Sequence, residues 1–316
     1  MLRISNLRVS IGDTPILNGI STTCNKGQRL GIVGESGSGK TMTALAVVGL
    51  LPESATATGD VSLNDFELLG RTEEEMTRIR GRKVSMIFQD SLTSLDPLMK
   101  VGRQMSLPLK LRNIAKAEAK STVIELMESV QLDRPGERYQ SYPHQLSGGQ
   151  RQRVNLAMSL AGEPEVLIAD EPTTALDVTV KARVAKLLRS VVDRTETSLI
   201  LITHDLPLVA FICERIAVMY GGYIVEEGDT TEILRNPRHR YTAALIASMP
   251  VLRTRRNKGD RLPSIPGSVP AAGDFPSGCP FRNRCAAATA QCETMPETVS
   301  NGSHRFACWH PVEAPA

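Results

Sequence analysis

The sequence is poor in aromatic residues, nearly balanced in charge and free of long apolar runs. Aromatic side chains make up 4% of its 316 residues, whereas apolar residues together make up 41%, as in an ordinary globular protein. Basic residues exceed acidic ones by only three, 37 against 34, so we expect no nucleic-acid partner. No apolar stretch approaches the ~18 residues that cross a bilayer, and the first residues lack the apolar segment of a secretory signal. We therefore expect a cytoplasmic protein that meets a membrane only through partners.

Cysteine is also scarce, except near the end of the chain. Two of the six cysteines, Cys24 and Cys213, stand among apolar residues and are expected in the core. The other four follow the pattern C-x5-C-x6-C-x15-C, at Cys279, Cys285, Cys292 and Cys308. In a reducing compartment, clustered thiols indicate metal ligands before disulfides. The spacing is wider than in most zinc sites, and four thiolates suit a 4Fe–4S cluster. We predict such a cluster in a structural role, with zinc or unligated thiols as alternatives.

The spacing of apolar residues divides the chain into an α/β part, a helical insertion and a tail. Alternating and short apolar segments predict strands, and longer ones predict helices, in an order typical of a mostly parallel sheet with crossover helices and a flanking antiparallel β part. Helical periodicity over about 92–145 indicates an inserted helical subdomain. We expect the core domain to end near 245 and residues 246–316 to form a Pro- and Cys-rich tail outside the sheet. The predicted strands are 1–24, 28–33, 61–69, 84–88, 165–170 and 198–203, with a hairpin at 216–227 and helices at 41–51, 148–161 and 178–193.

A glycine-rich segment between a predicted strand and a predicted helix matches G-x-x-x-x-G-K-S/T in full. Glycines let the backbone curl so that its N–H groups face an anion, and the helix N-terminus adds a positive dipole end. Lys40 would reach the β- and γ-phosphates of a nucleotide, and the Thr41 hydroxyl would coordinate Mg²⁺. The residues expected to bind the nucleotide are Gly34, Glu35, Ser36, Gly37, Ser38, Gly39, Lys40 and Thr41.

Two later strands end in polar residues that complete such a site. The apolar segment 165–169 runs into Asp170 and Glu171, and the carboxyl end of a parallel strand lies beside the phosphate loop in an open α/β sheet. We expect Asp170 to hold Mg²⁺ through its water shell. Glu171 would polarise an attacking water. His204 follows the apolar strand 198–203 and should reach the same edge.

A third motif, Leu146-Ser-Gly-Gly-Gln150, precedes a predicted helix and lies between the phosphate loop and the acidic strand. With Gln89 after Ile87-Phe88, and with Asp177, these motifs resemble an ATP-binding cassette (ABC) ATPase over about residues 1–245. In that family two cassettes dimerise head to tail around ATP and Mg²⁺. The resemblance implies an α/β P-loop fold and ATP hydrolysis.

The resemblance also implies a role for each motif. Glu171 would be the general base, and His204 would contact the γ-phosphate together with Lys40. Gln89 would sense the γ-phosphate and join Thr41 and Asp170 around Mg²⁺. Ala175, Leu176 and Asp177 would cross the dimer interface, and Ile11 stands where the family commonly stacks an aromatic ring on adenine. The motif residues that would act in trans on the partner's nucleotide are Ser147, Gly148, Gly149 and Gln150.

Three further segments resemble the oligopeptide/dipeptide/nickel importer branch of the family: 88–97, 236–242 and 265–270. Some relatives in this branch carry an iron–sulfur cluster in the tail. The branch implies a heterodimer with a second related ABC ATPase, two membrane permeases whose coupling helices dock near 89–101, and an extracytoplasmic solute-binding protein. The chain would then lie peripherally on the cytoplasmic face of the inner membrane and power the import of di- or oligopeptides. The alternatives are import of nickel or another small solute, or a cassette ATPase without a permease that acts in translation, DNA repair or a metabolic complex.

Overall fold

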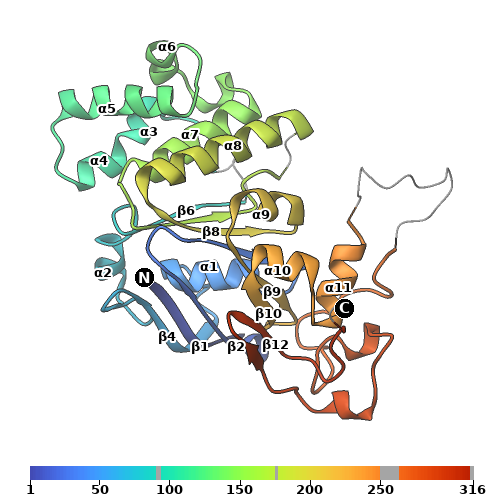
Figure 1. Ribbon diagram of the computed structural model, residues 1–316. Coiled ribbons are helices and arrows are strands. Elements are labelled where there is room, and N and C mark those ends of the chain that lie inside the picture. Colours follow the sequence, from blue (N-terminus) through green and yellow to red (C-terminus); the bar gives the residue numbers. More distant parts are fainter. Residues whose placement is uncertain (90–93, 175–176, 250–262, 314–316) are drawn as a thin grey trace.

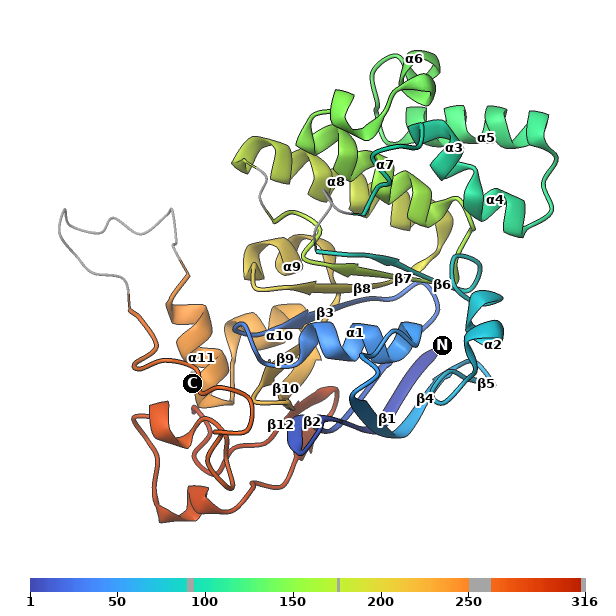
Figure 2. The same cartoon turned by 180° about the vertical axis from the view of Figure 1, so that it is seen from behind.

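The structure is a computed structural model that describes residues 1–89, 94–174, 177–249 and 263–313. Two β-sheets and the helix between them form its centre (Figures 1 and 2). The helix α1 (Lys40–Val48) packs its buried face into an apolar core shared by both sheets. This arrangement confirms the predicted mixed α/β fold with a flanking antiparallel sheet. The antiparallel sheet has the order β2 (Thr14–Cys24), β1 (Leu2–Ile11), β4 (Ala55–Leu63) and β5 (Phe66–Glu67).

The main sheet is parallel over five neighbouring strands. Strands β7 and β8 are buried along their whole length, because one face packs on α1 and the antiparallel sheet and the other packs on helices. Ile168 and Ile200 face the first of these cores, whereas Leu167 and Leu199 face the second. Their continuous apolar sequence is the pattern of a strand covered on both sides. The parallel strands, in spatial order, are β9 (Arg215–Tyr220), β3 (Arg29–Val33), β8 (Ser198–Thr203), β7 (Val166–Asp170) and β6 (Val84–Ile87).

Helices cover the second face of the main sheet and extend from it as a separate group. The sheet is covered by α7 (Gly148–Leu160), α8 (Val178–Thr195) and α9 (Leu206–Ile212). The group beyond them, at the top of Figure 1, lies in the segment where the sequence predicts a helical insertion. It comprises α3 (Val101–Met105), α4 (Leu107–Leu111), α5 (Lys116–Ser129), α6 (Pro135–Gln140) and the 3₁₀ turn η1 (Pro143–Gln145). The remaining helices are α2 (Glu73–Thr77), α10 (Thr230–Arg235) and α11 (Arg240–Ala247).

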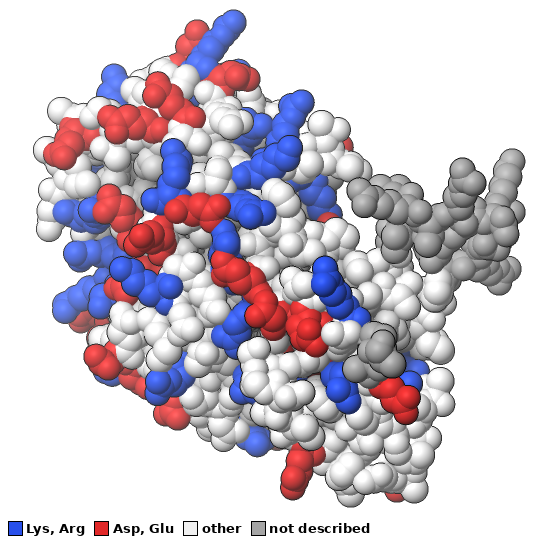
Figure 3. Space-filling view, in the orientation of Figure 1, with Lys and Arg blue, Asp and Glu red and all other residues white. Residues whose placement is uncertain are grey.

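The surface mixes charges of both signs. Basic and acidic side chains are interspersed on the face drawn in Figure 3, with no large area of one sign. Within the described ranges, no helix combines the length and apolar character needed to pass through a bilayer.

The tail joins the main sheet, which corrects the prediction that it lies outside it. Strands β11 (Val299–Asn301) and β12 (His304–Phe306) form a hairpin, and β12 pairs antiparallel with β10 (Tyr223–Asp229). Each tail strand has only three residues, too short for alternation to be visible in the sequence. The 3₁₀ turns η2 (Arg282–Arg284) and η3 (Ala290–Glu293) complete the tail.

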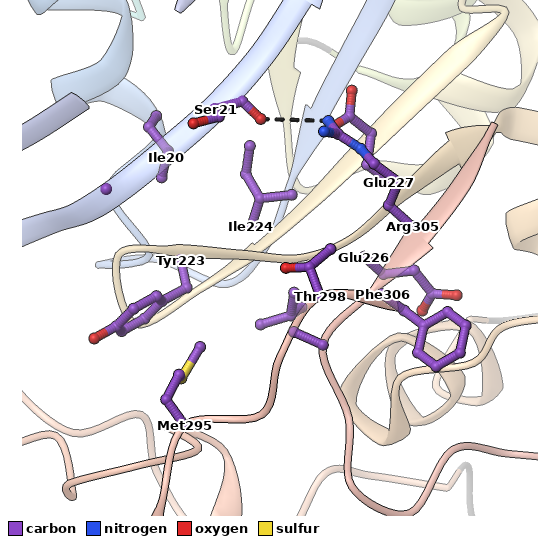
Figure 4. Close-up of a pocket in the computed structure, with 13 residues that line it drawn as sticks. Ile20, Ser21, Tyr223, Ile224, Glu226, Glu227, Met295, Thr298, Arg305 and Phe306 are labelled. Carbon is purple, nitrogen blue, oxygen red and sulfur yellow. Dashed lines mark hydrogen bonds and ion pairs between the residues drawn. The ribbon is translucent and has the colours of Figure 1, made fainter. Parts of the chain in front are cut away.

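Two buried carboxylates of β10 hold the tail strand in place. Glu227 is 1% exposed and pairs with Arg215 of β9 and Arg305 of β12. Glu226, also 1% exposed, accepts a hydrogen bond from the His304 ring at 2.7 Å and from two backbone N–H groups. Figure 4 shows the adjoining pocket, in which Arg305 reaches the Ser21 carbonyl of β2. A buried carboxylate without partners is costly. Arg305 and His304 of the tail supply partners to the two buried carboxylates of β10, so the tail stabilises this edge of the sheet.

We therefore expect His304→Leu to lower the free energy of unfolding by about 1–3 kcal/mol, because it removes a hydrogen bond from the buried Glu226 carboxylate. Urea unfolding followed by circular dichroism measures this loss. His310→Leu is the matched control, because the His310 ring bonds only to the exposed side chain of Thr289 among the described residues. Equal urea concentrations at the midpoint of unfolding for the two variants would contradict the anchoring role of His304.

Candidate active site

The site lies where three neighbouring parallel strands end. The register pairs Val33 of β3 with Thr203 of β8, and Asp170 of β7 with Ile202 of β8. The phosphate loop follows Val33, Glu171 follows Asp170, and His204 follows Thr203. Because carboxyl ends of parallel strands meet at one edge, the three predicted groups come together.

The phosphate loop closes around the Lys40 ammonium group. Its Nζ donates to the carbonyl oxygens of Gly34 at 2.9 Å and Glu35 at 2.8 Å, and to Ser38 Oγ at 3.3 Å. Burial lowers the pKa of Lys40, while the charges of Glu171, Asp170 and Glu35 act in the opposite direction. Gly34 has no room for a side chain, since a Cβ there would lie 2.2 Å from the Met219 carbonyl oxygen. The loop thus presents a cation and backbone N–H groups in a concave surface, as anion binding requires.

Asp170 fits a divalent cation. The residue is 1% exposed, its Oδ1 has no hydrogen-bond partner among the described residues, and burial raises the pKa of its carboxyl group despite a hydrogen bond with Thr41. A buried carboxylate oxygen beside a hydroxyl is a suitable ligand set for Mg²⁺. Gln89 is exposed and lines the same pocket as Lys40, Thr41, Asp170 and Glu171.

Glu171 is held by four hydrogen bonds in a fixed orientation. Its Oε1 lies 2.7 Å from His204 Nδ1 and accepts the His204 N–H at 3.0 Å. Its Oε2 accepts from the hydroxyls of Thr174 at 3.1 Å and Thr203 at 3.3 Å. The backbone of Glu171 is left-handed, at φ +48°, which turns the chain away from the strand direction directly after Asp170. The two successive carboxylates therefore lie in different surroundings: Asp170 is beside Thr41, and Glu171 is beside His204, Thr174 and Thr203.

The Ser-Gly-Gly-Gln motif lies apart from the phosphate loop of its own chain. Ser147 Oγ accepts the Gln150 N–H at 3.3 Å, and Gln150 Oε1 accepts the Ser147 N–H at 2.9 Å, a capping box that starts α7. A Cβ on Gly149 would lie 2.9 Å from Val180 of α8, so the two helix starts are adjacent. Asp177 Oδ1 caps α8. None of these residues, nor Gly148, lines the pocket of Lys40. Ala175 and Leu176 lie outside the described residues, as do residues 90–93 of the segment 88–97.

The structure adds residues that the sequence analysis did not find. Ile16 and Ala272 line the pocket of Lys40, whereas Ile11, 37% exposed at the end of β1, does not. The Tyr241 hydroxyl accepts the Glu35 N–H at 2.9 Å. Tyr241 is placed by His239, which burial keeps neutral by lowering its pKa to about 3 and whose Nδ1 accepts the Tyr241 N–H. The segment 236–242 is one of those that resemble the importer branch, but the sequence gives no sign that Tyr241 in this segment contacts the phosphate loop.

Comparison with known proteins agrees with this geometry. A family model described as "ABC transporter" matches residues 17–174, and one described as "Oligopeptide/dipeptide transporter, C-terminal region" matches residues 225–292. The chain is 44% identical over 306 residues to a probable peptide ABC transporter ATP-binding protein of Sinorhizobium fredii, covering 95% of this chain and 90% of the relative. It is 41% identical over 320 residues to the oligopeptide transport ATP-binding protein OppD of Escherichia coli, covering 99% of this chain and 94% of the relative. The chain belongs to the ABC transporter family.

This ABC protein also resembles solved cassettes in three dimensions. It matches the dimeric structure of MJ0796, a bacterial ABC transporter cassette, with a TM-score of 0.65 and 27% identity over 73% of this chain and 99% of that one. CbiO1 from Clostridium perfringens, part of the ABC transporter complex CbiONQ, gives a TM-score of 0.63 at 25% identity, over 73% of this chain and 89% of that one. The chain is therefore an ATPase whose hydrolysis of ATP is coupled to transport.

The predicted iron–sulfur cluster is wrong for this ABC protein. Within the described residues, which include all four tail cysteines, no group of three or more His, Cys, Asp or Glu side chains could hold a metal ion. Burial raises the pKa of the Cys279 thiol to about 11, and that of Cys308 as well, so both favour the protonated form over the thiolate that binds metals. The spacing in the sequence indicated proximity, but it could not indicate this burial.

We expect Cys279 to be alkylated slowly in the native protein. A pKa of about 11 instead of 9.0 gives about a hundredfold less thiolate at pH 8, and the rate should rise about tenfold per pH unit toward pH 11. Mass spectrometry of iodoacetamide-treated protein at several pH values measures this, with urea-unfolded protein as the control. Equal rates in native and unfolded protein, or stoichiometric iron in protein purified without oxygen, would contradict this account.

Proposed function

We propose that the chain is the ATP-hydrolysing subunit of an importer of di- or oligopeptides. The observation that carries this proposal is the single pocket in which Lys40 and Thr41 of the phosphate loop meet Asp170 and Glu171. The solute class is supported by peptide-transport relatives such as the dipeptide transport ATP-binding protein DppD of Bacillus subtilis, 41% identical over 98% of this chain and 94% of the relative.

In the proposed mechanism, each residue of the pocket has one task. Lys40 leaves the carbonyl oxygens of Gly34 and Glu35 and donates to the β- and γ-phosphates. Asp170 and Thr41, with Gln89 at the same pocket, are the residues that would hold Mg²⁺, which supplies positive charge at the phosphate oxygens. Gly34, Ser36, Gly37, Ser38 and Gly39 provide the backbone N–H groups around the phosphates, whereas the Glu35 N–H is donated to the Tyr241 hydroxyl and shapes the loop.

Glu171 then acts as the general base. It takes a proton from the water that attacks the γ-phosphorus while the bond to the β–γ bridging oxygen breaks. The His204 ring contacts this carboxylate at 2.7 Å and, with 66% of its side chain exposed, can turn to the γ-phosphate, while the His204 backbone N–H at 3.0 Å keeps the carboxylate in place. Holding a base in one orientation lowers the cost of reaching the transition state.

A second cassette completes the site. The described residues place Ser147, Gly148, Gly149 and Gln150 outside their own nucleotide pocket, which supports a role in trans on a partner's nucleotide. We propose that the partner is a second, related ABC ATPase, with Asp177 at the interface. Two permeases and an extracytoplasmic solute-binding protein would complete the importer, with this chain on the cytoplasmic face of the membrane.

An apolar groove provides a place for the permease. It lies between β6 and helices α3, α4 and α7, and Phe88, Leu107 and Leu111 along it are 42%, 44% and 48% exposed. Such a patch beside Gln89 suits the docking of a short helix from a membrane subunit. The groove adjoins residues 94–101, part of the segment expected to receive the coupling helix.

We expect Glu171→Gln to abolish ATP turnover while ATP binding persists, because the amide cannot accept the proton of the attacking water. Phosphate release and ATP binding are measured on the assembled transporter. Glu125→Gln, on the exposed face of α5, is the matched control and should keep normal turnover. Near-normal hydrolysis by Glu171→Gln would show that another group is the base.

We expect Leu107→Glu to abolish peptide uptake while the purified subunit still binds ATP, because a charge in the groove opposes apolar docking. Uptake of a labelled peptide in cells and co-purification of the permeases measure this. Leu50→Glu is the control, since Leu50 is similarly exposed, at 40%, and lies outside the groove. Normal uptake by Leu107→Glu would contradict docking at this groove.

A further inference from the structure

The tail reaches the phosphate loop through one buried arginine. Arg284 of η2 donates to both carboxylate oxygens of Glu35, at 2.7 and 3.2 Å, and only 6% of its side chain is exposed. It also donates to the Tyr220 hydroxyl at 3.2 Å and to the Pro266 carbonyl oxygen at 2.8 Å. Arg284 is therefore fixed on both sides, by the tail and by the cassette.

Glu35 is an unfavourable residue for an anion-binding loop. It is the second residue of the glycine-rich segment, and its carbonyl oxygen lies 2.8 Å from Lys40 Nζ. A free carboxylate here would repel the charge of a triphosphate, since two like charges close together in a partly dry site interact strongly. A bidentate pair with a guanidinium group binds a carboxylate strongly and leaves the two side chains with no net charge.

A second contact brings the tail to the same pocket. Ala272 lines it together with Ile16, Lys40 and Thr41. The next residue, Gly273, lies against the β1–β2 turn, because a Cβ there would be 3.3 Å from Thr14 Cγ2. The aromatic rings of Phe275 and Phe281 pack on Tyr220, beside Arg284. The tail thus lines the nucleotide pocket through Ala272 and bonds to the phosphate loop through Arg284.

We propose that the C-terminal tail is part of the nucleotide site of its own chain, with Arg284 as a positioning residue that holds Glu35 and cancels its charge so that the phosphate loop accepts a nucleoside triphosphate. This inference rests on the proposed function, because it takes the ligand of the pocket to be a nucleotide.

The test measures binding of a fluorescent ATP analogue to the full chain at low and high salt. Arg284→Met should raise the Kd on the order of tenfold, because Glu35 then leaves an unpaired negative charge in the phosphate loop close to Lys40. This loss of affinity for the analogue should be smaller at high salt, because salt screens the charge of Glu35. Arg284→Lys should recover part of the affinity, since one ammonium replaces a two-pronged guanidinium. The double variant with Glu35→Gln should recover most of it, because the repelling charge is gone.

Arg305→Met is the matched control. It removes another ion pair between tail and cassette, at Glu227 of β10, which belongs neither to the phosphate loop nor to the nucleotide pocket. Thermal unfolding should reveal lower stability in both methionine variants, but only Arg284→Met should bind the analogue weakly. Equal Kd values for the two variants, or no recovery with Glu35→Gln, would overturn the inference. Failure of the unmodified chain to bind the analogue would instead overturn the proposed function.

Discussion

The side-by-side packing of β3, β8 and β7 is the constraint on which this protein's chemistry depends. Because these strands are parallel and buried on both faces, their carboxyl ends lie at one edge with no freedom to slide. The phosphate loop, the two carboxylates and His204 each begin where one strand stops. A one-residue shift of β7 would exchange the surroundings of Asp170 and Glu171, so the register decides which carboxylate lies beside Thr41 and which beside His204.

Much of this edge could be predicted from the sequence. The apolar segments before Gly34, Asp170 and His204 are short, continuous and bounded by polar residues, so periodicity alone places them as buried strands. Local rules also predict the start of α7, because a Ser followed three residues later by Gln forms a capping box. The Glu171–His204 contact could not be predicted in this way, because it depends on a left-handed turn at Glu171 that no local pattern announces.

The resemblance of the tail to the oligopeptide/dipeptide transporter branch is confirmed, but its place outside the sheet and its metal cluster were wrongly predicted. Three acidic residues of the cassette each receive a basic partner from the tail: Glu35 from Arg284, Glu226 from His304 and Glu227 from Arg305. These pairs join residues far apart in the chain and lack any fixed spacing. The four tail cysteines are clustered in the sequence and led to the metal prediction, but two of them, Cys279 and Cys292, are buried and act as ordinary packing residues. The tail is thus held by two arginine–carboxylate pairs, by the hydrogen bond between His304 and Glu226, and by aromatic packing.

The central claim is that this cassette drives a membrane importer together with a second cassette. The most direct measurement is purification of the chain from detergent-solubilised membranes, followed by mass spectrometry of the proteins that accompany it. The account predicts two polytopic permeases and one related ABC ATPase in equal amounts. Recovery from the soluble fraction alone, with ribosomal, DNA-repair or metabolic-enzyme partners, would contradict the transport role and leave only the ATPase chemistry.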